Sequence, residues 1–401
     1  MLGVGLSGKK RSDDSLDELF ALAQSAGMDP AIRLVCQRPR PDAAHFIGDG
    51  KADEVDALIK EHQIHTVVFD HILSPSQHRN LEVRWRVEVI DRTELILEIF
   101  AARARSHDGK LQVELARLEH LASRIVRGWS HLERQKGGIG LRGGPGEKQL
   151  ELDRRMLGDR LKKIKAKLAT VQKQRKTQRR SRDRGQLFTV AIVGYTNAGK
   201  STLFNALTRS DTYAADQLFA TLDTLTRKIQ FVHATPEMAI SDTVGFIRDL
   251  PHQLVAAFKA TLDETAKADL LLHIVDAASP DRDDQAEQVG VVLEDIGAAD
   301  VPTILVHNKI DLAGLEPRVE RDARGNIVKV LVSAQTRDGL DLLRSALIEA
   351  AQDHLQGHLQ GRSRSAGDFD VRFDRKFDVV DLTLVSDLAH GSDLVKKTLN
   401  T

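Results

Sequence analysis

The residues with the clearest chemical potential are 194–201, which read GYTNAGKS and have the types and spacing to bind nucleotide phosphates. They fit the pattern G-x-x-x-x-G-K-[ST] between a predicted strand and a predicted helix. Gly194 and Gly199 allow the backbone to turn its N–H groups toward phosphate. Lys200 would reach the β- and γ-phosphates, and the Ser201 hydroxyl would bind Mg²⁺. The pattern predicts a P-loop and therefore a nucleotide site, without saying which nucleotide.

Three further segments follow the P-loop in the order that a GTPase requires. Asp242 suits an indirect contact with Mg²⁺, and Gly245 suits an N–H contact with the γ-phosphate. The Asp311 carboxylate can accept hydrogen bonds from guanine N1–H and N2–H₂; adenine offers no such pair, and an unpaired carboxylate would be costly. At Ser333-Ala334 a backbone N–H can meet guanine O6. Each segment follows a predicted strand, and the four motifs together predict a GTP site.

A Mg²⁺-ligating threonine is also required between the P-loop and Asp242, on a loop that the γ-phosphate can order. Residues 216–224 read DQLFATLDT. Thr221 is the best candidate, and Thr224 and Thr226 remain alternatives because several threonines lie close together.

These motifs require a sheet whose strands end at one edge. Residues 186–351 alternate between strand and helix patterns, and we expect a doubly wound α/β P-loop GTPase domain there. Its strands are predicted near residues 188–193, 229–233, 237–241, 270–275, 303–307 and 328–332.

Residues 1–105 are predicted to form a small N-terminal α/β domain with a parallel sheet. A first strand is expected before Gly5, but only Leu2 and Val4 remain there, so we expect that strand to be missing or the chain to start internally. Helices are predicted at residues 15–26, 52–62 and 75–83, and strands at residues 32–37, 65–70 and 86–90.

Residues 106–185 are predicted to form a basic antiparallel helical hairpin, the arm. Apolar stripes at spacings of three and four, over residues 111–132 and 150–171, flank the glycine-rich residues 137–146, which we expect to be non-helical. Residues 110–184 contain 22 Lys or Arg and 8 Asp or Glu, whereas the whole chain has a net charge of zero. Such a basic segment is typical of nucleic-acid binding, and a merely solvated face is the alternative.

The remaining sequence gives weaker signals. Residues 352–367 are polar and predicted to be a linker, and residues 368–401 a small C-terminal α+β piece. The single cysteine, Cys36, excludes an internal disulfide and indicates a reducing compartment. No apolar run reaches the roughly 18 residues that span a membrane, and the N-terminus lacks the apolar core of a signal peptide. We expect a cytoplasmic monomer and leave peripheral membrane association open.

Together these motifs resemble one family. The segments GYTNAGKSTLFN, FATLD, DTVGFIRDLPHQLV and NKID, with the arm segment SRIVRGWSHLERQKGGIGLRG, are similar to those of HflX-type GTPases of the Obg-related translation-factor class. The resemblance covers roughly residues 15–350. It implies GTP hydrolysis and binding to the large ribosomal subunit and its RNA, with the arm tip near the peptidyl-transferase region. It also implies GTP-dependent splitting or rescue of stalled or idle ribosomes, notably under stress.

The resemblance further implies which residues form the site. Mg²⁺ is expected at Ser201 and Thr221. Lys200, Thr221, Gly245 and Asn197 are expected to act in catalysis. The residues expected to contact GTP or GDP are Gly194, Tyr195, Thr196, Asn197, Ala198, Gly199, Lys200, Ser201, Phe219, Ala220, Thr221, Leu222, Asp223, Asp242, Thr243, Val244, Gly245, Asn308, Lys309, Ile310, Asp311, Ser333, Ala334 and Gln335.

Phe246 stands directly after Gly245, where many GTPases have a glutamine that orients water. A phenylalanine cannot do so, and the family shares this substitution, so we expect slow intrinsic hydrolysis that the ribosome stimulates. Asn197 resembles the asparagine of GTPases that bind K⁺ in place of an arginine finger, which makes K⁺ a further hypothesis.

Two features depart from this scheme. The family usually has one glycine before Pro145 and a threonine at the position of Lys148, whereas this chain has two glycines, 143–144, and a lysine, so the register of the tip on RNA is open. Residues 48–51 (GDGK) are interpreted as a loop and helix start, with an ATP-binding site as the alternative. The alternative overall function is a GTP-gated RNA-binding scaffold or ribosome-assembly factor; an RNA-modification GTPase is less favoured because no modifying domain is visible.

Overall fold

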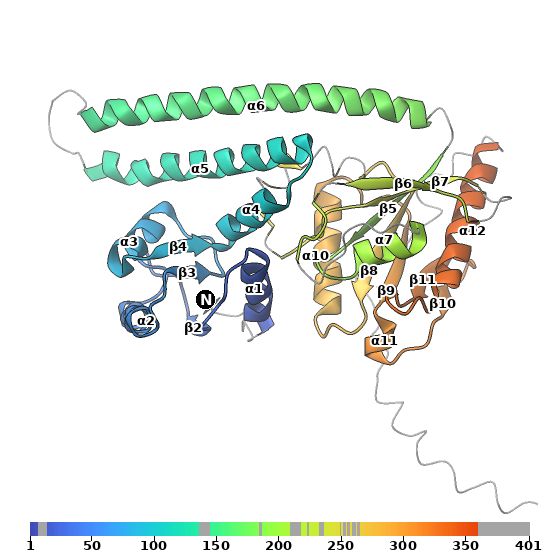
Figure 1. The fold of residues 1–401 in the computed structure, drawn as a ribbon, viewed down its shortest axis with the longest axis horizontal. Helices are drawn as coiled ribbons and strands as arrows, with labels where there is room; N and C mark the ends of the chain where they lie inside the picture. The colour runs from blue at the N-terminus through green and yellow to red at the C-terminus, as the bar shows by residue number, and fades with distance from the viewer. Residues whose placement is uncertain are drawn as a thin grey trace, which may run out of the picture.

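The structure is a computed structural model that describes residues 1–6, 14–135, 145–183, 187–208, 218–222, 224–231, 236–248 and 265–359, and residues 250, 251, 254, 257, 258 and 262 between them. The predicted C-terminal piece, the arm tip at residues 136–144 and Asp223 lie outside the described residues. Figure 1 shows an N-terminal α/β unit, a helical arm and a second α/β unit in chain order.

The N-terminal unit is built on a parallel four-stranded sheet with the order β2-β1-β3-β4. The expectation of a missing first strand is wrong: Leu2 and Val4 are buried in β1, which pairs with both β2 and β3. The elements are β1 (Leu2–Leu6), α1 (Asp14–Ser25), β2 (Leu34–Arg38), α2 (Asp49–His62), β3 (Thr66–Phe69), α3 (Pro75–Trp85), β4 (Glu88–Asp91) and α4 (Arg92–Arg103).

Helix α4 was absent from the predicted elements, although its start has a clear signal. The Asp91 side chain accepts a hydrogen bond from the Glu94 N–H at 2.9 Å, and the Glu94 side chain accepts one from the Asp91 N–H at 3.3 Å. This reciprocal pair is a capping box, which satisfies two backbone donors at the helix start. The helix directly follows β4 and is buried along most of its length.

The arm consists of α5 (His107–Gln135) and α6 (Pro145–Asp183), which run side by side as the apolar stripes predict (Figure 1). Leu111 and Leu115 of α5 and Ile164 and Leu168 of α6 are buried. The glycine-rich break was predicted through residue 146, but α6 begins at Pro145, a residue that the first helical turn tolerates because its missing N–H would be unpaired there.

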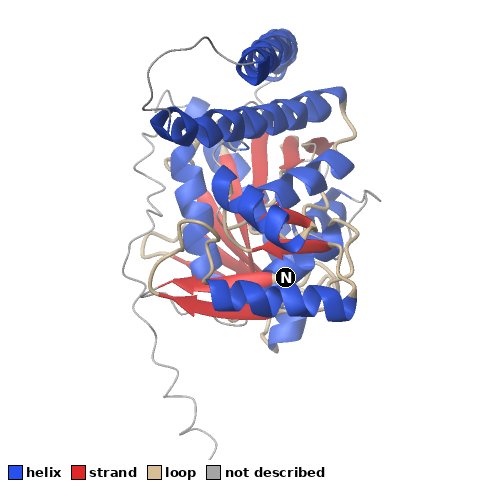
Figure 2. Ribbon diagram, turned by 90° about the vertical axis from the view of Figure 1, so that its left-hand side faces the viewer, coloured by secondary structure: helices blue, strands red, loops and turns tan. Residues whose placement is uncertain are grey.

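In the described residues the second unit is built on a seven-stranded sheet with the order β10-β11-β9-β8-β5-β7-β6, whose edge strands β10 and β6 pair antiparallel while the strands between them pair parallel. Helices pack on both faces of this sheet: Val289 and Leu293 join Ala191 and Val193 in one core, whereas Leu203 and Leu343 join Val190 and Ile192 in another. Figure 2 views the molecule from the side of the N-terminal unit. The α/β fold class predicted from the sequence is thus confirmed. Its elements are β5 (Phe188–Gly194), α7 (Lys200–Thr208), β6 (Leu225–Ile229), β7 (Met238–Asp242), β8 (Leu270–Asp276), α10 (Arg282–Asp295), β9 (Thr303–Asn308), α11 (Ile310–Ala313), β10 (Val319–Arg321), β11 (Ile327–Leu331) and α12 (Leu340–Leu359).

Three predictions for this unit need correction. Strand β6 covers residues 225–229 rather than 229–233, and β10 was not predicted. Residues 352–359, predicted as part of a linker, continue helix α12. The linker was predicted from the polar residues of this segment. A helix that packs through one face, however, exposes polar side chains on the other.

One hydrophobic core joins all three parts of the chain. It contains Leu22 of α1, Phe100 of α4, Leu115 of α5, Ile164 of α6 and Phe258 of the second unit. The N-terminal unit also has its own core, which includes Leu81 and Trp85 of α3. The shared core holds α4 against the edge of the second sheet at which the predicted nucleotide motifs lie.

Candidate functional site

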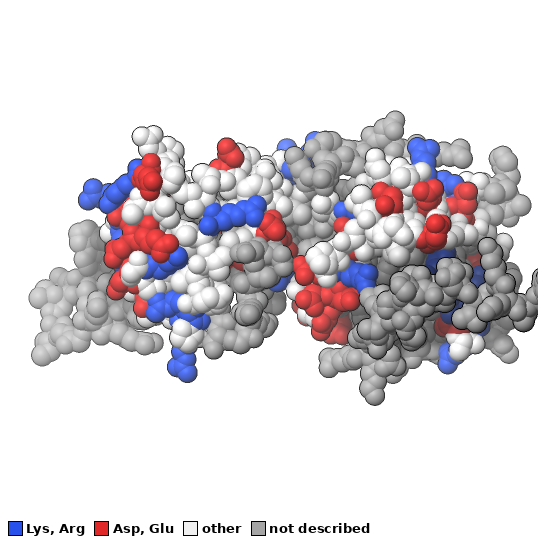
Figure 3. All heavy atoms as spheres, turned by 90° about the horizontal axis from the view of Figure 1, so that it is seen from below, with Lys and Arg blue, Asp and Glu red and all other residues white. Residues whose placement is uncertain are grey.

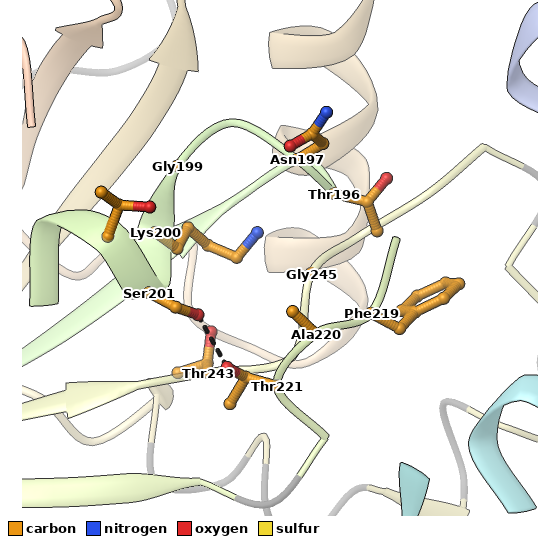
Figure 4. A pocket seen from close by; sticks show the side chains of 11 residues that line it. Thr196, Asn197, Gly199, Lys200, Ser201, Phe219, Ala220, Thr221, Thr243 and Gly245 are labelled. Carbon is orange, nitrogen blue, oxygen red and sulfur yellow. Dashed lines mark hydrogen bonds between the residues drawn. The ribbon is translucent and has the colours of Figure 1, made fainter. Parts of the chain in front are cut away.

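The P-loop connects β5 to α7 and lines a pocket (Figure 4). Gly194 and Gly199 have φ values of +149° and +90°, in the region that favours glycine. A Cβ at Gly194 would lie 2.3 Å from the Ile274 carbonyl oxygen, and one at Gly199 would lie 2.2 Å from Asn308 Nδ2. Both glycines are therefore required by space as well as by backbone conformation. The pocket is lined by Thr196, Asn197, Gly199, Lys200, Ser201, Thr202, Phe219, Ala220, Thr221, Thr243 and Gly245.

Three oxygen-bearing side chains converge at the end of the pocket where Mg²⁺ is predicted. Ser201 Oγ lies 2.7 Å from Thr221 Oγ1, and both hydroxyls donate to Asp242 Oδ2, at 2.7 Å and 2.9 Å. Asp242 is buried, and its Oδ1 has no hydrogen-bond partner in the described part of the chain. Hydroxyl and carboxylate oxygens are the ligands that Mg²⁺ prefers, so this cluster fits a hard cation.

Among the three threonines considered, only Thr221 reaches Ser201. The Thr226 hydroxyl instead bonds Ser241 Oγ at 2.9 Å within the β6–β7 pair. Thr224 Oγ1 is buried without a hydrogen-bond partner among the described residues.

Lys200 lies across the pocket from these hydroxyls and is buried, with its ammonium donating to the Tyr195 carbonyl oxygen at 2.5 Å. Burial lowers its pKa to about 8. A Cβ added at Gly245 would lie 2.9 Å from Lys200 Nζ, which places the Gly245 backbone directly against the lysine. The lysine and this glycine therefore lie side by side at the pocket.

Residues 242–248 are held against the P-loop by backbone hydrogen bonds. The Thr196 N–H donates to Phe246 O at 2.7 Å, and the Phe246 N–H donates to Gly194 O at 3.1 Å. The Phe246 side chain is 1% exposed and belongs to the shared core. The residue at the position of the water-orienting glutamine is therefore a packing residue here.

The guanine side of the site is organised by Asn308. Its Nδ2 donates to Ala198 O at 2.9 Å, and its Oδ1 accepts from the Ala334 N–H at 2.9 Å, so it ties the P-loop to the loop after β11. Lys309 Nζ pairs with Asp276 Oδ2 at 2.8 Å. Asp311 is exposed in the first turn of α11. These residues do not line the pocket described above.

Several residues predicted to contact the nucleotide point elsewhere. The Tyr195 hydroxyl donates to Glu18 Oε2 of α1 and accepts the Arg248 N–H at 2.8 Å. The Phe219 side chain is 2% exposed and packs on Phe100, although Phe219 is among the residues that line the pocket (Figure 4). Leu222 is buried in the shared core. These side chains contact residues far away in the sequence, so no local sequence pattern indicates that they point away from the nucleotide.

Comparison with known proteins agrees with this geometry. Residues 13–101 match a family described as "GTP-binding GTPase N-terminal", and residues 103–182 match "GTP-binding GTPase Middle Region". Residues 189–309 match "50S ribosome-binding GTPase". The chain is also 54% identical to "GTPase HflX" of Escherichia coli (strain K12) over 337 residues, 84% of this chain and 79% of that protein. The chain belongs to the HflX GTPase family.

Other members of the HflX family match almost as well. "GTPase HflX" of Magnetococcus marinus is 49% identical over 336 residues, 84% of this chain and 77% of that protein. A solved GTP-binding protein from Sulfolobus solfataricus in complex with GDP has 24% identity and a TM-score of 0.45, covering 88% of this chain and 99% of that one, a likeness too weak to transfer a function. Family membership makes this protein a GTPase that binds GTP and GDP.

The structure gives little support to an anion-binding site at residues 48–51 of the N-terminal unit. Residues 48–51 form the start of α2, and Lys51 pairs with Glu54 at 2.8 Å. Arg84 pairs with Asp49 and Asp53. Lys51 and Arg84 thus already have acidic partners, and ATP binding here stays an untested prediction. None of the helices in the described ranges is long and apolar enough to cross a membrane.

The HflX pocket makes nucleotide affinity depend on pH. Burial lowers the pKa of Lys200 to about 8, and bound phosphates would raise it. Above pH 8 binding therefore takes up a proton, and we expect the association constant for GTP to fall by up to roughly tenfold per pH unit. Titration with a fluorescent GTP analogue between pH 7 and 9.5 tests this. Lys200→Arg, whose guanidinium does not titrate in this range, should show only the fall caused by loss of the guanine N1 proton at the alkaline end, which both proteins share. A wild-type curve no steeper than that of the variant contradicts the prediction.

A glutamine introduced at position 246, directly after Gly245, is not expected to accelerate GTP hydrolysis. Because Phe246 is buried, Phe246→Gln would leave an amide in the apolar core and should destabilise the fold by about 3 kcal/mol. Denaturant unfolding and intrinsic GTP turnover measure the two effects. Phe246→Leu is the control and should lose less stability. A stable glutamine variant with faster turnover would show that the side chain can reach the pocket.

Proposed function

We propose that this HflX GTPase binds the large ribosomal subunit and its RNA and splits or rescues stalled or idle ribosomes, notably under stress. The observation that carries the proposal is the direct connection of basic helix α6 to β5, the strand that leads into the P-loop. Lys162, Lys163 and Lys167 are exposed on α6. By contrast, the face opposite the arm mixes acidic with basic side chains (Figure 3). Positive charge suited to RNA phosphates therefore lies on the arm.

The proposed chemistry is in-line attack of water on the γ-phosphate of GTP. Lys200 and the Gly245 N–H would stabilise the developing charge, and Ser201 and Thr221 would hold Mg²⁺. Mg²⁺ bound there would neutralise negative charge on the phosphates. Because Phe246 is buried, we infer slow intrinsic hydrolysis that the large subunit stimulates.

The decisive experiment is GTP turnover with and without purified large subunits. We expect stimulation, and we expect GTP-dependent dissociation of whole ribosomes by light scattering. Absence of stimulation would overturn the splitting-factor proposal and favour a GTP-gated scaffold or assembly factor. Stimulated turnover without dissociation would retain ribosome binding and reject splitting.

The contribution of the arm can be separated from that of the nucleotide site. Replacing Lys162, Lys163 and Lys167 with Gln should weaken large-subunit binding and reduce its salt dependence by roughly one unit of log–log slope per lost phosphate contact. Affinity for GDP should not change, because the pocket residues are untouched. Lys165→Gln is the matched control, since Lys165 pairs with Glu119 at 2.8 Å within the hairpin. Equal losses in control and triple variant would argue against a phosphate-binding face.

We further propose that K⁺ assists hydrolysis through Asn197. This residue is exposed, is among those that line the pocket, and has a φ of 61° (Figure 4). Turnover should be faster in K⁺ than in Na⁺ buffer, and Asn197→Ala should remove the difference. Indistinguishable wild-type rates in the two buffers would reject the idea.

A further inference from the structure

The segment that carries the predicted guanine contact is a very short helix. Asp311 lies in the first turn of α11, which has only four residues, Ile310–Ala313. A helix of one turn makes too few hydrogen bonds to hold its own conformation. Its start is also unfavourable for the backbone, because Lys309 adopts a left-handed conformation with a φ of 63°. The position of Asp311 therefore depends on contacts that other segments make with the start of α11.

Asp276, the last residue of β8, makes one of these contacts. The Lys309 ammonium lies 2.8 Å from Asp276 Oδ2, and the two side chains are 25% and 19% exposed. The other carboxylate oxygen, Oδ1, accepts from the Ala278 N–H at 3.0 Å, which closes a turn directly after the strand. Because both of its oxygens are engaged, the Asp276 carboxylate is fixed at the end of β8 and holds the lysine in turn.

Backbone and apolar contacts join the same two segments. Asp276 lies beside Asn308 in the register of β8 and β9, and the Ala277 N–H donates to Asn308 O at 2.8 Å. Ile310 is buried in a small cluster that also contains Ala277. These contacts hold the residues on either side of Lys309, and the ion pair holds Lys309 itself.

The ion pair also neutralises a cation near the P-loop lysine. Burial lowers the pKa of Lys200 to about 8, and the positive charge of Lys309 acts in the same direction. Two ammonium groups close enough to have this effect repel each other. The Asp276 carboxylate offsets that repulsion, which would otherwise push Lys309 and the first turn of α11 away from the P-loop.

We propose that Asp276 is a positioning residue for guanine recognition, acting through Lys309 on Asp311. In this arrangement Asp276 does not touch the nucleotide. It holds the start of α11 so that the Asp311 carboxylate faces guanine N1–H and N2–H₂. The proposal rests on the guanine contact predicted for Asp311 and is independent of the ribosomal role.

Asp276→Asn in the full chain tests the proposal, because an amide oxygen can still accept from the Ala278 N–H while the charge that holds Lys309 is lost. We expect affinity for GDP to fall about tenfold, the usual scale for a lost hydrogen bond to a charged group. Inosine diphosphate lacks the N2 amine, so its affinity should fall less, and the preference for GDP over inosine diphosphate should shrink about threefold or more. A variant that is merely less stable would keep this preference.

Turnover measurements separate this effect from catalysis. At saturating GTP the single-turnover rate should stay within twofold while KM rises, because Lys200 and Gly245 are unchanged. GTP and GDP should be weakened equally, since the guanine base is common to both. A loss confined to GTP would place the effect at Lys200 and overturn the proposal.

A second variant tests whether the two charged residues act as one pair. Lys309→Met keeps the aliphatic part of the side chain and removes the ammonium. Adding Asp276→Asn to it should change GDP affinity less than twofold, because neither substitution can break the pair a second time. Asp281→Asn is the matched control: Asp281 is exposed five residues later, at the start of α10, and its loss of charge should leave the affinities for GDP and inosine diphosphate unchanged.

Hydrogen exchange distinguishes the role of Asp276 from the guanine contact on which it rests. Without nucleotide, exchange over residues 310–315 should be faster in Asp276→Asn than in the wild type. Unchanged exchange would overturn the positioning role of Asp276. Faster exchange with an unchanged preference for GDP over inosine diphosphate would instead reject Asp311 as the guanine contact, and the proposal with it. If Asp276→Asn does not fold, Lys309→Met carries the same measurements.

Discussion

Lys200→Ala is expected to lower kcat/KM for GTP by about 10³-fold, comparable to removal of one strong donor from a preorganised transition-state site. The ammonium is buried at the end of the pocket against the Gly245 backbone, where it meets developing phosphate charge without competition from water. In such a site the electrostatic contribution of one cation is large. Single-turnover GTP hydrolysis at pH 7 measures the loss.

The same variant should not lose stability, which separates this effect from unfolding. Burial lowers the Lys200 pKa from 10.5 to about 8, so the folded state binds the proton less tightly than the unfolded state does. At pH 7 the buried charge therefore costs about 3 kcal/mol of folding free energy. Removing the buried charge recovers this free energy, which offsets the stability lost with the side-chain packing and with the hydrogen bond to Tyr195 O. A variant that lost activity in parallel with thermal stability would contradict a direct role in catalysis.

The parts of the site that could be predicted from sequence depend on local chemistry. Gly194, Gly199 and Lys200 lie in one short segment whose backbone geometry fixes their types, and the other motifs follow strands that end at one sheet edge. The arm could also be predicted from local sequence, because its apolar stripes repeat at helical spacing over many turns. Local patterns of this kind leave few alternative structures.

The parts that could not be predicted depend on contacts between distant segments. Tyr195 and Glu18 are 177 residues apart, so nothing near the P-loop showed that this tyrosine turns away from the nucleotide. Phe219 likewise lies in a segment whose sequence matches the expected nucleotide-binding motif. Its ring, however, is buried against Phe100 of the N-terminal unit. Strand β6 was misplaced because none of its residues is fully buried at this sheet edge and it carries Arg227 and Lys228, which weakens the apolar signal.

Asp311→Asn is expected to reverse base preference, the second large effect. The Asp311 carboxylate is predicted to accept from guanine N1–H and N2–H₂, and an asparagine amide replaces one acceptor with a donor. We expect affinity for GTP to fall by about 10²- to 10³-fold, because a donor would then face the guanine amine. Affinity for xanthosine triphosphate should rise, since xanthine has a carbonyl oxygen in place of that amine.

This substitution should not disturb the fold, because Asp311 is exposed in the first turn of α11 and asparagine has nearly the same shape as aspartate. Competition binding of GTP and xanthosine triphosphate measures the reversal, with inosine triphosphate on the wild type reporting the N2 contact alone. Asp341→Asn is the matched control: Asp341 is also exposed in a first helical turn of the same unit, and it pairs with Arg344. If Asp311→Asn kept the wild-type order of affinities, guanine recognition would have to lie in other groups, and Asp311 would have no part in it.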